Sequence, residues 1–206
     1  MREADVCLVL EGSYPYVSGG VSSWVHDLIR QQNDKTFHIV TIVSPSTPLK
    51  HIYDLPSNII SIKPIVLQKL KKGQRTFFGR QAFFRNLEDD LLELLMASST
   101  CNFTSLVKSF NKYRRNLGSW LLLDSIGGWE LVKHLYRKTI PNESFLDFFW
   151  STRFLLGGLF SILLNDVPPS RTYHAICTGY AGLFTAKAQI ETQRPCFITE
   201  HGIYTN

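Results

Sequence analysis

The sequence predicts an α/β protein with a Rossmann-like parallel sheet and a helical insertion. The continuous apolar run at 6–10 is typical of a strand covered on both faces. After a loop rich in Gly, Ser and Pro, apolar residues recur at helical spacing over 21–29, and a second strand pattern follows at 37–43. Strand, helix and strand at these lengths begin a doubly wound sheet, and the alternation returns near the end of the sequence.

A third strand is expected over 58–67, where Pro64 breaks the pattern. From about 80 to 165 the apolar spacing becomes helical, with one helix around 87–95 and another over 145–164. These residues are therefore expected to form a helical insertion within a single domain that covers 1–206.

The rest of the chain completes the sheet. Trp120 to Leu123 and the pair Gly127-Gly128 predict a turn between helices of the insertion. Strands are expected at 173–177 and 195–199, joined by a helix over 181–191 in a right-handed βαβ unit.

The composition fits a soluble globular protein, with 44% apolar and 19% charged residues and a net charge of +5. No acidic residue lies between Asp54 and Glu88, where the chain has Lys63, Lys69, Lys71, Lys72, Arg75, Arg80 and Arg85. A solvated basic loop explains this run more simply than nucleic-acid binding, because no recognition motif accompanies the charge.

Cysteine usage and apolar patterning indicate a cytoplasmic protein. The 4 cysteines have no C-x-x-C spacing, which supports neither a disulfide framework nor a zinc site, and the acidic N-terminus is no secretory signal. Asp147 and Arg153 interrupt the apolar stretch at 145–164, so a buried helix is favoured over a membrane span. A peripheral contact with the inner membrane is the alternative.

Three loops follow predicted strands, at 11–20, 178–182 and 200–202. The carboxyl ends of parallel strands share one edge, so these loops should converge into one ligand site. Gly19 and Gly20 lead directly into a helix, whose free N–H groups and dipole attract phosphate. Two glycines that only make a tight turn are the alternative, since neither a dinucleotide fingerprint nor a P-loop is present.

The last loop supplies the candidate catalytic residue. His201 can donate a hydrogen bond to a sugar hydroxyl or to a developing negative charge, or it can cap backbone groups. Glu200 can accept a hydroxyl proton or simply order the loop. His174 and His26 are interpreted as packed residues within a strand and a helix.

Four segments together resemble a known family: 5–26, 148–153, 178–182 and 199–205. The chain resembles the N-terminal domain of the PelF-type glycosyltransferases of Pel exopolysaccharide synthesis. The resemblance implies the N-terminal half of a GT-B fold, retention of anomeric configuration, a UDP-sugar donor, a glycan acceptor and no metal. It places Gly19 and Gly20 near the donor diphosphate and His201 at the donor sugar. Thr178, Gly179 and Glu200, from the other two strand-end loops, are further candidate substrate-binding residues because these loops should converge.

The resemblance does not extend to the family's C-terminal, donor-binding domain, which is absent from these 206 residues. This chain is therefore expected to be inactive alone. The alternative function is a non-catalytic module whose helical insertion docks onto a membrane-bound polysaccharide-synthase complex. An NAD-dependent oxidoreductase is disfavoured because the glycine fingerprint is missing.

Overall fold

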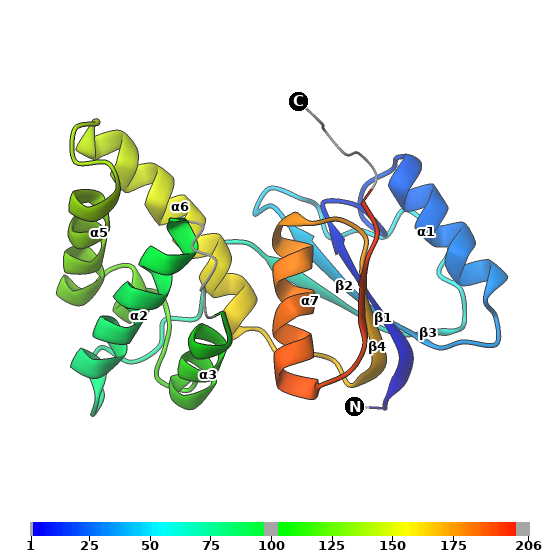
Figure 1. Ribbon diagram of the computed structural model, residues 1–206. Helices are drawn as coiled ribbons and strands as arrows, with labels where there is room; N and C mark the ends of the chain where they lie inside the picture. The colour runs from blue at the N-terminus through cyan, green and yellow to red at the C-terminus, as the bar shows by residue number, and fades with distance from the viewer. Residues whose placement is uncertain (1, 97–102, 201–206) are drawn as a thin grey trace. The chain divides into compact units, whose positions relative to one another are not determined.

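The protein is described by a computed structural model in which residues 2–96 and 103–200 are placed. These residues divide into two compact units (Figure 1). The first comprises Met1–Leu67 and Asn165–Asn206, and the second comprises Gln68–Leu164.

The described part of the first unit forms a parallel sheet of five strands in the order β3-β2-β1-β4-β5. The strands are β1 (Ala4–Glu11), β2 (Phe37–Val43), β3 (Ile59–Val66), β4 (Ser170–Ala175) and β5 (Cys196–Ile198). The strand order reverses between β1 and β4, which makes this pair the topological switch point of a Rossmann-like sheet. The predicted fold class is confirmed.

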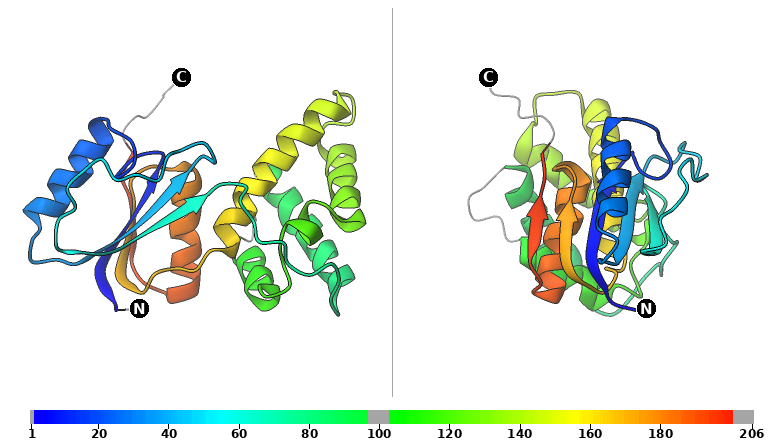
Figure 2. Two further views of the ribbon diagram at one scale, coloured as in Figure 1. Left: turned by 180° about the vertical axis from the view of Figure 1, so that it is seen from behind. Right: turned by 90° about the vertical axis from the view of Figure 1, so that its right-hand side faces the viewer.

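Helices α1 (Gly20–Gln31) and α7 (Gly179–Thr192) cover opposite faces of this sheet (Figures 1 and 2). Every residue of β2 is buried, as expected for a strand covered on both sides. The core beneath α1 is made of apolar side chains from the central strands, the helix and the two loops after β1 and β4: Leu8, Leu10, Tyr14, Val25, Ile29, Phe37, Ile39 and Ile176.

The predicted interruption of the third strand at Pro64 is wrong. β3 runs through this residue, and Pro64 lies opposite Thr41 in the register with β2. β3 is an edge strand, and an edge strand tolerates proline because one side of its backbone makes no ladder hydrogen bonds.

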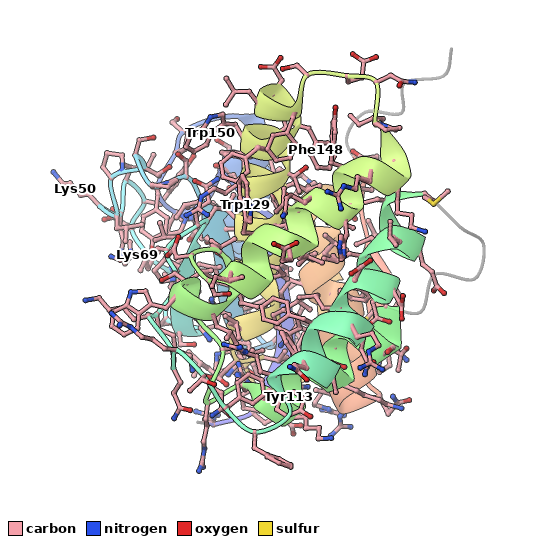
Figure 3. The ribbon with its side chains drawn as sticks, turned by 90° about the vertical axis from the view of Figure 1, so that its left-hand side faces the viewer. Lys50, Lys69, Tyr113, Trp129, Phe148 and Trp150 are labelled. Carbon is pink, nitrogen blue, oxygen red and sulfur yellow. The ribbon has the colours of Figure 1, made fainter. Side chains whose placement is uncertain are left out.

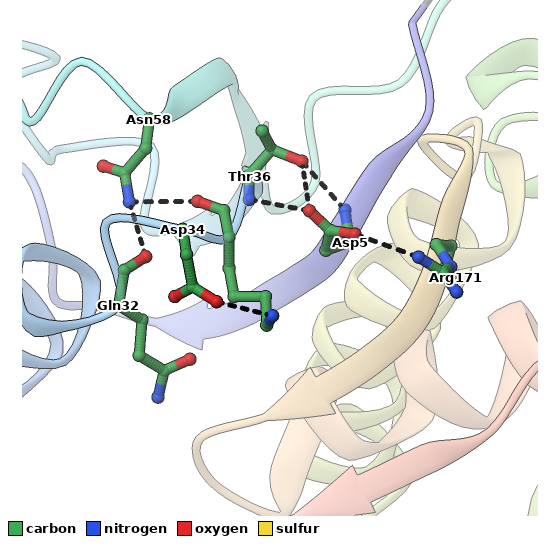
Figure 4. A network of polar contacts seen from close by, with 7 residues as sticks. Asp5, Gln32, Asp34, Thr36, Asn58 and Arg171 are labelled. Carbon is green, nitrogen blue, oxygen red and sulfur yellow. Dashed lines mark hydrogen bonds and ion pairs between the residues drawn. The ribbon is translucent and has the colours of Figure 1, made fainter.

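A polar network joins the amino ends of the strands, at the edge of the sheet opposite their carboxyl ends (Figure 4). The Asp5 carboxylate accepts hydrogen bonds from Thr36 N at 2.9 Å and Thr36 Oγ1 at 2.8 Å, and Arg171 Nη1 lies 3.3 Å away. These hydrogen bonds from Thr36, with Arg171, lower the pKa of Asp5. Asn58 Nδ2 donates to the carbonyl of Gln32 at 3.1 Å, which ties the end of α1 to the start of β3.

The described part of the second unit is entirely helical. Its helices are α2 (Arg80–Leu95), α3 (Phe103–Tyr113), α4 (Ser119–Leu122), α5 (Ile126–Thr139) and α6 (Phe145–Leu164). The ring of Phe110 contacts those of Phe83 and Phe160, with centroids 5.8 and 5.4 Å away, and these aromatic contacts join α2, α3 and α6.

Helix α6 is long and apolar enough to cross a membrane by length and composition alone. Half of its most apolar window is buried within the structure, including every residue of 156–163. The structure is therefore compatible with a soluble protein.

Two predicted boundaries need correction. The predicted turn between helices lies at 123–125, between α4 and α5, and Gly127-Gly128 belongs to the first turn of α5, where the Ser125 hydroxyl accepts a hydrogen bond from Gly128 N at 3.0 Å. Gly127 packs closely against Phe84, since an added Cβ would lie 2.6 Å from that ring and the ring would have to shift. The strand expected at 173–177 runs from Ser170 to Ala175, so Cys177 lies in the loop before α7 and not in a strand.

Candidate functional site

A cavity of about 350 Å³ opens at the carboxyl edge of the sheet, at the switch point between β1 and β4. The loop after β1, the start of α1, the loop after β4 and the residue Glu200 beyond β5 all contribute to it. Its lining residues are Glu11, Gly12, Ser13, Val17, Ser18, Gly19, Gly20, Val21, Ser22, Ile176, Cys177 and Glu200. Segments distant in sequence thus meet at this edge, where ligands bind in open α/β sheets.

The start of α1 presents uncapped backbone donors to this cavity. Gly19 is the N-cap residue and has no side chain to accept a hydrogen bond, and the first turn contains no acid. The first N–H groups of a helix have no partner within the helix, so they are available to an oxygen atom of a ligand. A Cβ added at Gly19 or Gly20 would meet nothing within 4 Å. Neither packing nor strain therefore explains these glycines.

The loop between β1 and α1 is held by its own hydrogen bonds. Ser22 Oγ donates to the carbonyl of Val17 at 2.6 Å, and Thr41 Oγ1 donates to the carbonyl of Tyr14 at 2.8 Å. The hydroxyl oxygen of Ser13, which also lines the cavity, is buried without a hydrogen-bond partner among the described residues. The loop is thus fixed in shape but keeps an unused polar atom beside the cavity.

Glu11, the last residue of β1, caps the start of α7. Its Oε2 accepts hydrogen bonds from Tyr180 N at 3.0 Å and from Ala181 N at 3.4 Å. Gly179 has a φ of +38°, and a Cβ there would lie 2.7 Å from this carboxylate oxygen. Only glycine allows so close an approach. The start of α7 is therefore already occupied by a carboxylate of the chain itself, unlike the start of α1.

The cavity is acidic. Burial raises the pKa of the Cys177 thiol to about 11, and the nearby charges of Glu11 and Glu200 contribute to the increase. The thiol is therefore protonated at neutral pH and is a poor nucleophile. Among the described lining residues there are two carboxylates and no Lys, Arg or His. Carboxylates accept hydrogen bonds from hydroxyl groups but repel phosphate.

The structure brings part of the predicted site together. Gly19, Gly20 and Glu200 all line the cavity. Thr178 and Gly179 lie at the start of α7, outside the cavity lining, because the loop predicted at 178–182 is the beginning of the helix.

The histidines occupy different positions. His201 lies outside the described residues, so its role stays a prediction. His174 Nε2 lies 2.8 Å from Thr199 Oγ1, and burial lowers the pKa of this imidazole. His26 Nδ1 lies 3.3 Å from the Tyr14 hydroxyl.

Sequence reasoning placed Glu11 in the converging loop at 11–20 without singling it out, and it missed Cys177 as part of the site. The signal for Glu11 was its position, since it is the first charged residue after a buried strand and therefore stands at the ligand-binding edge. Cys177 was assigned to a strand, which concealed its position in the cavity wall.

A second, larger hollow of about 660 Å³ lies beside α1 and is lined by residues including His26, Tyr53 and Asn58. It is not at the carboxyl edge of the sheet, and Asn58 there already donates to the Gln32 carbonyl. We therefore place the candidate site at the smaller cavity. Within the described residues, no group of three or more His, Cys, Asp or Glu side chains could hold a metal ion.

Fold and site together define a Rossmann-like α/β domain with a cavity at its topological switch point. The chain belongs to the family described as Domain of unknown function (DUF3492), which matches residues 4–206. This family is associated with glycosyltransferases. Comparison with curated proteins found no match, and neither did comparison with solved structures.

Proposed function

We propose that this domain is the N-terminal half of the cleft of a retaining, UDP-sugar-dependent glycosyltransferase of the PelF type, which acts in cytoplasmic exopolysaccharide synthesis. The observation that carries the proposal is the cavity at the switch point, where the uncapped start of α1 meets two carboxylates. The family's association with glycosyltransferases and the resemblance of four sequence segments support the same assignment.

The charges of the cavity suggest how the donor is divided between the two halves of the cleft. A diphosphate needs positive charge around it, and the described lining offers only backbone N–H groups at Gly20 and the next residues. Glu11 and Glu200 suit the hydroxyl groups of a sugar. The domain therefore contacts the transferred sugar and one edge of the diphosphate, and the opposite half of the cleft supplies the counter-charge and holds the nucleotide.

His201 follows Glu200 directly in the sequence, and we propose that it contacts the transferred sugar. The glycan acceptor enters from the same edge, and the reaction proceeds without a metal ion. Because the domain offers little positive charge to the diphosphate, it binds UDP-sugars weakly when separated from the opposite half and is inactive alone.

The two glycines of α1 provide the sharpest test, because the structure has room for a methyl group at both. Gly19→Ala and Gly20→Ala should fold normally, yet each methyl group would project where the diphosphate approaches. We expect the Kd for UDP-glucose to rise at least about tenfold, equivalent to ~1.4 kcal/mol, in the protein with both halves of the cleft. Isothermal titration calorimetry measures this.

The matched control is Gly182→Ala, a glycine in α7 that does not line the cavity and whose added Cβ would make only an ordinary contact at 3.9 Å. It should bind UDP-glucose like the original protein. Unchanged affinity in both α1 variants would contradict the proposed place of the diphosphate.

A second candidate function is a non-catalytic docking module, and a specific surface favours it. On α6, the side chains of Leu146, Trp150 and Phe154 are 63%, 60% and 61% exposed and follow one another at helical spacing. Figure 3 labels Trp150 and Trp129, a second exposed tryptophan that belongs to α5 of the same unit. Contiguous exposed apolar side chains mark interaction sites in soluble proteins. As a docking module, the domain contacts a membrane-bound partner of polysaccharide synthesis through α6.

A further inference from the structure

The positive charge of this protein is concentrated in its helical unit. Residues 68–164 contain 14 Lys and Arg against 8 acids, while the rest of the chain contains 8 against 9. The densest part is the segment 68–79, here called the basic loop, which contains Lys69, Lys71, Lys72 and Arg75 and no acid. All four of these side chains are exposed.

The basic loop is held in one conformation by the backbone of its own unit. Ser119 N donates to the Lys71 carbonyl at 2.9 Å, and Trp120 N donates to the Lys72 carbonyl at 3.1 Å. Gly73 has a φ of +70°, and a Cβ there would lie 2.6 Å from neighbouring backbone. The cations are therefore presented by a fixed backbone, which lowers the entropic cost of binding.

The charges of the basic loop are not neutralised by acids. Among the described residues none of the four cations forms an ion pair with a carboxylate. Lys72 Nζ and Arg75 Cζ lie over the Trp120 ring, at 5.2 and 4.8 Å from its centroid. Beyond them, the Phe78 side chain is fully exposed, with 102% of its reference surface in contact with solvent. Such exposure of a phenylalanine is costly in water.

We propose that the basic loop is a contact surface for the anionic headgroups of a lipid bilayer, with Phe78 entering the interfacial region. Clustered cations beside an exposed aromatic side chain match the chemistry of this interface, which attracts Lys and Arg and accommodates aromatic rings. This inference is independent of the proposed sugar-nucleotide site, which lies in the other unit.

A single-stranded nucleic acid is the competing anionic partner, and the loop suits it less well. Binding of that kind uses free aromatic faces on which successive bases stack. Here the Trp120 ring is covered by two cations of the loop itself, which leaves Phe78 as the fully exposed ring of this segment.

The test measures binding of the protein to vesicles of phosphatidylcholine, alone or mixed in equal parts with phosphatidylglycerol. Binding should require phosphatidylglycerol and should weaken as salt is added. The triple variant Lys69→Gln, Lys72→Gln, Arg75→Gln should lose about 100-fold in partitioning, since each cation near an anionic surface contributes roughly fivefold. Phe78→Ala should lose several-fold, with a smaller dependence on salt.

Matched controls come from α5 of the same unit. Replacement of Lys133, Arg137 and Lys138 by glutamine removes the same charge, and Ile126→Ala removes an apolar side chain that is 82% exposed. Both should retain binding within about threefold. The proposal is overturned if the α5 variants lose as much as the loop variants, or if neutral vesicles bind equally well. Tighter binding to a single-stranded RNA oligomer with the same loop dependence overturns it as well.

Discussion

The carboxylate of Glu11 connects residues that are far apart in sequence. It stands at the end of β1 and accepts hydrogen bonds from the first N–H groups of α7, 169 residues later for Tyr180. An anion at this position satisfies backbone donors and interacts favourably with the helix dipole. The same side chain lines the cavity, so one residue both holds the site together and gives it negative charge.

Replacing Glu11 by Gln tests this dual role. The amide keeps an acceptor oxygen but loses the charge, so we expect the free energy of unfolding at neutral pH to fall by about 1 kcal/mol. The pKa of Cys177 should fall as well, because the charge of Glu11 helps to raise it. Urea unfolding and titration of the thiol measure the two effects.

The control for this variant is Asp27→Asn, which removes a charge from an exposed position of α1. It should leave stability within about 0.5 kcal/mol. If Glu11→Gln unfolds at the same urea concentration as the control and the thiol titrates unchanged, the capping role is wrong.

Single residues of the site could be predicted only where the neighbouring sequence pattern shows that they lie beyond the end of a strand. Glu200 follows a strand pattern, Gly19 and Gly20 end the loop after another strand, and parallel strands bring their ends to one edge. Glu11 also follows a strand, but its partner is a helix start that no local pattern pairs with it. Nothing in the sequence distinguished the free start of α1 from the occupied start of α7, because that difference depends on one long-range contact.

Secondary-structure elements follow from sequence most closely where they are buried on all sides. β2 has the predicted bounds of 37–43, because its mostly apolar and β-branched residues suit a strand that is covered on both faces. Pro64 and Gly127 misled the prediction for tertiary reasons. The edge position of β3 tolerates a proline, and the close contact with the Phe84 ring favours a glycine inside α5.

The junction of β4 and β5 contains a pH-sensitive contact between His174 and Thr199. Burial lowers the pKa of this imidazole below its ordinary value of 6.5, so the folded state holds the proton less tightly than the unfolded chain does. The stabilising contribution of neutral His174 is therefore present above pH 6.5 and is lost as the pH falls toward the folded pKa.

We accordingly expect the free energy of unfolding to decrease as the pH falls from about 7 to 5. In the variant His174→Gln, the slope of unfolding free energy against pH should be smaller. Urea unfolding across the range measures it. The two proteins differ only at position 174, so the difference between the two curves isolates His174. Identical slopes would show that the imidazole has the same pKa in the folded and unfolded states.

At the scale of the whole chain, the second unit is inserted into the sequence of the first. All five strands lie within 1–67 and 165–206, as does the core beneath α1, while 68–164 contributes five helices of its own among the described residues. The sequence indicated such an insertion through its change of periodicity. The structure extends the helical unit back to Gln68, because the basic loop bonds to α4 rather than to the sheet.

This division predicts that the first unit folds without the second. Joining residue 67 to residue 165 through a short Gly/Ser linker should leave the sheet intact, with cooperative unfolding by circular dichroism. Association with membranes in cell fractionation should be lost. Aggregation or loss of cooperativity would mean that the units depend on each other for stability.

Variants of the intact chain show which surface is responsible for membrane association. If Trp150→Ser abolishes membrane association while the basic-loop triple variant retains it, α6 is the docking surface. The opposite result assigns the association to lipid contact through the basic loop.

The central position of β1 has a consequence for synthesis on the ribosome. Its neighbour β2 begins at Phe37, after a loop and α1, but its other neighbour, β4, begins only at Ser170. At about 5 to 20 residues per second, the nascent sheet waits roughly 5 to 20 seconds after β3 emerges before β4 can close it. During that interval one side of β1 is an unpaired edge, which is able to pair with foreign strands. The helices translated in between therefore delay the pairing of β1, the strand that ends at the cavity, with β4.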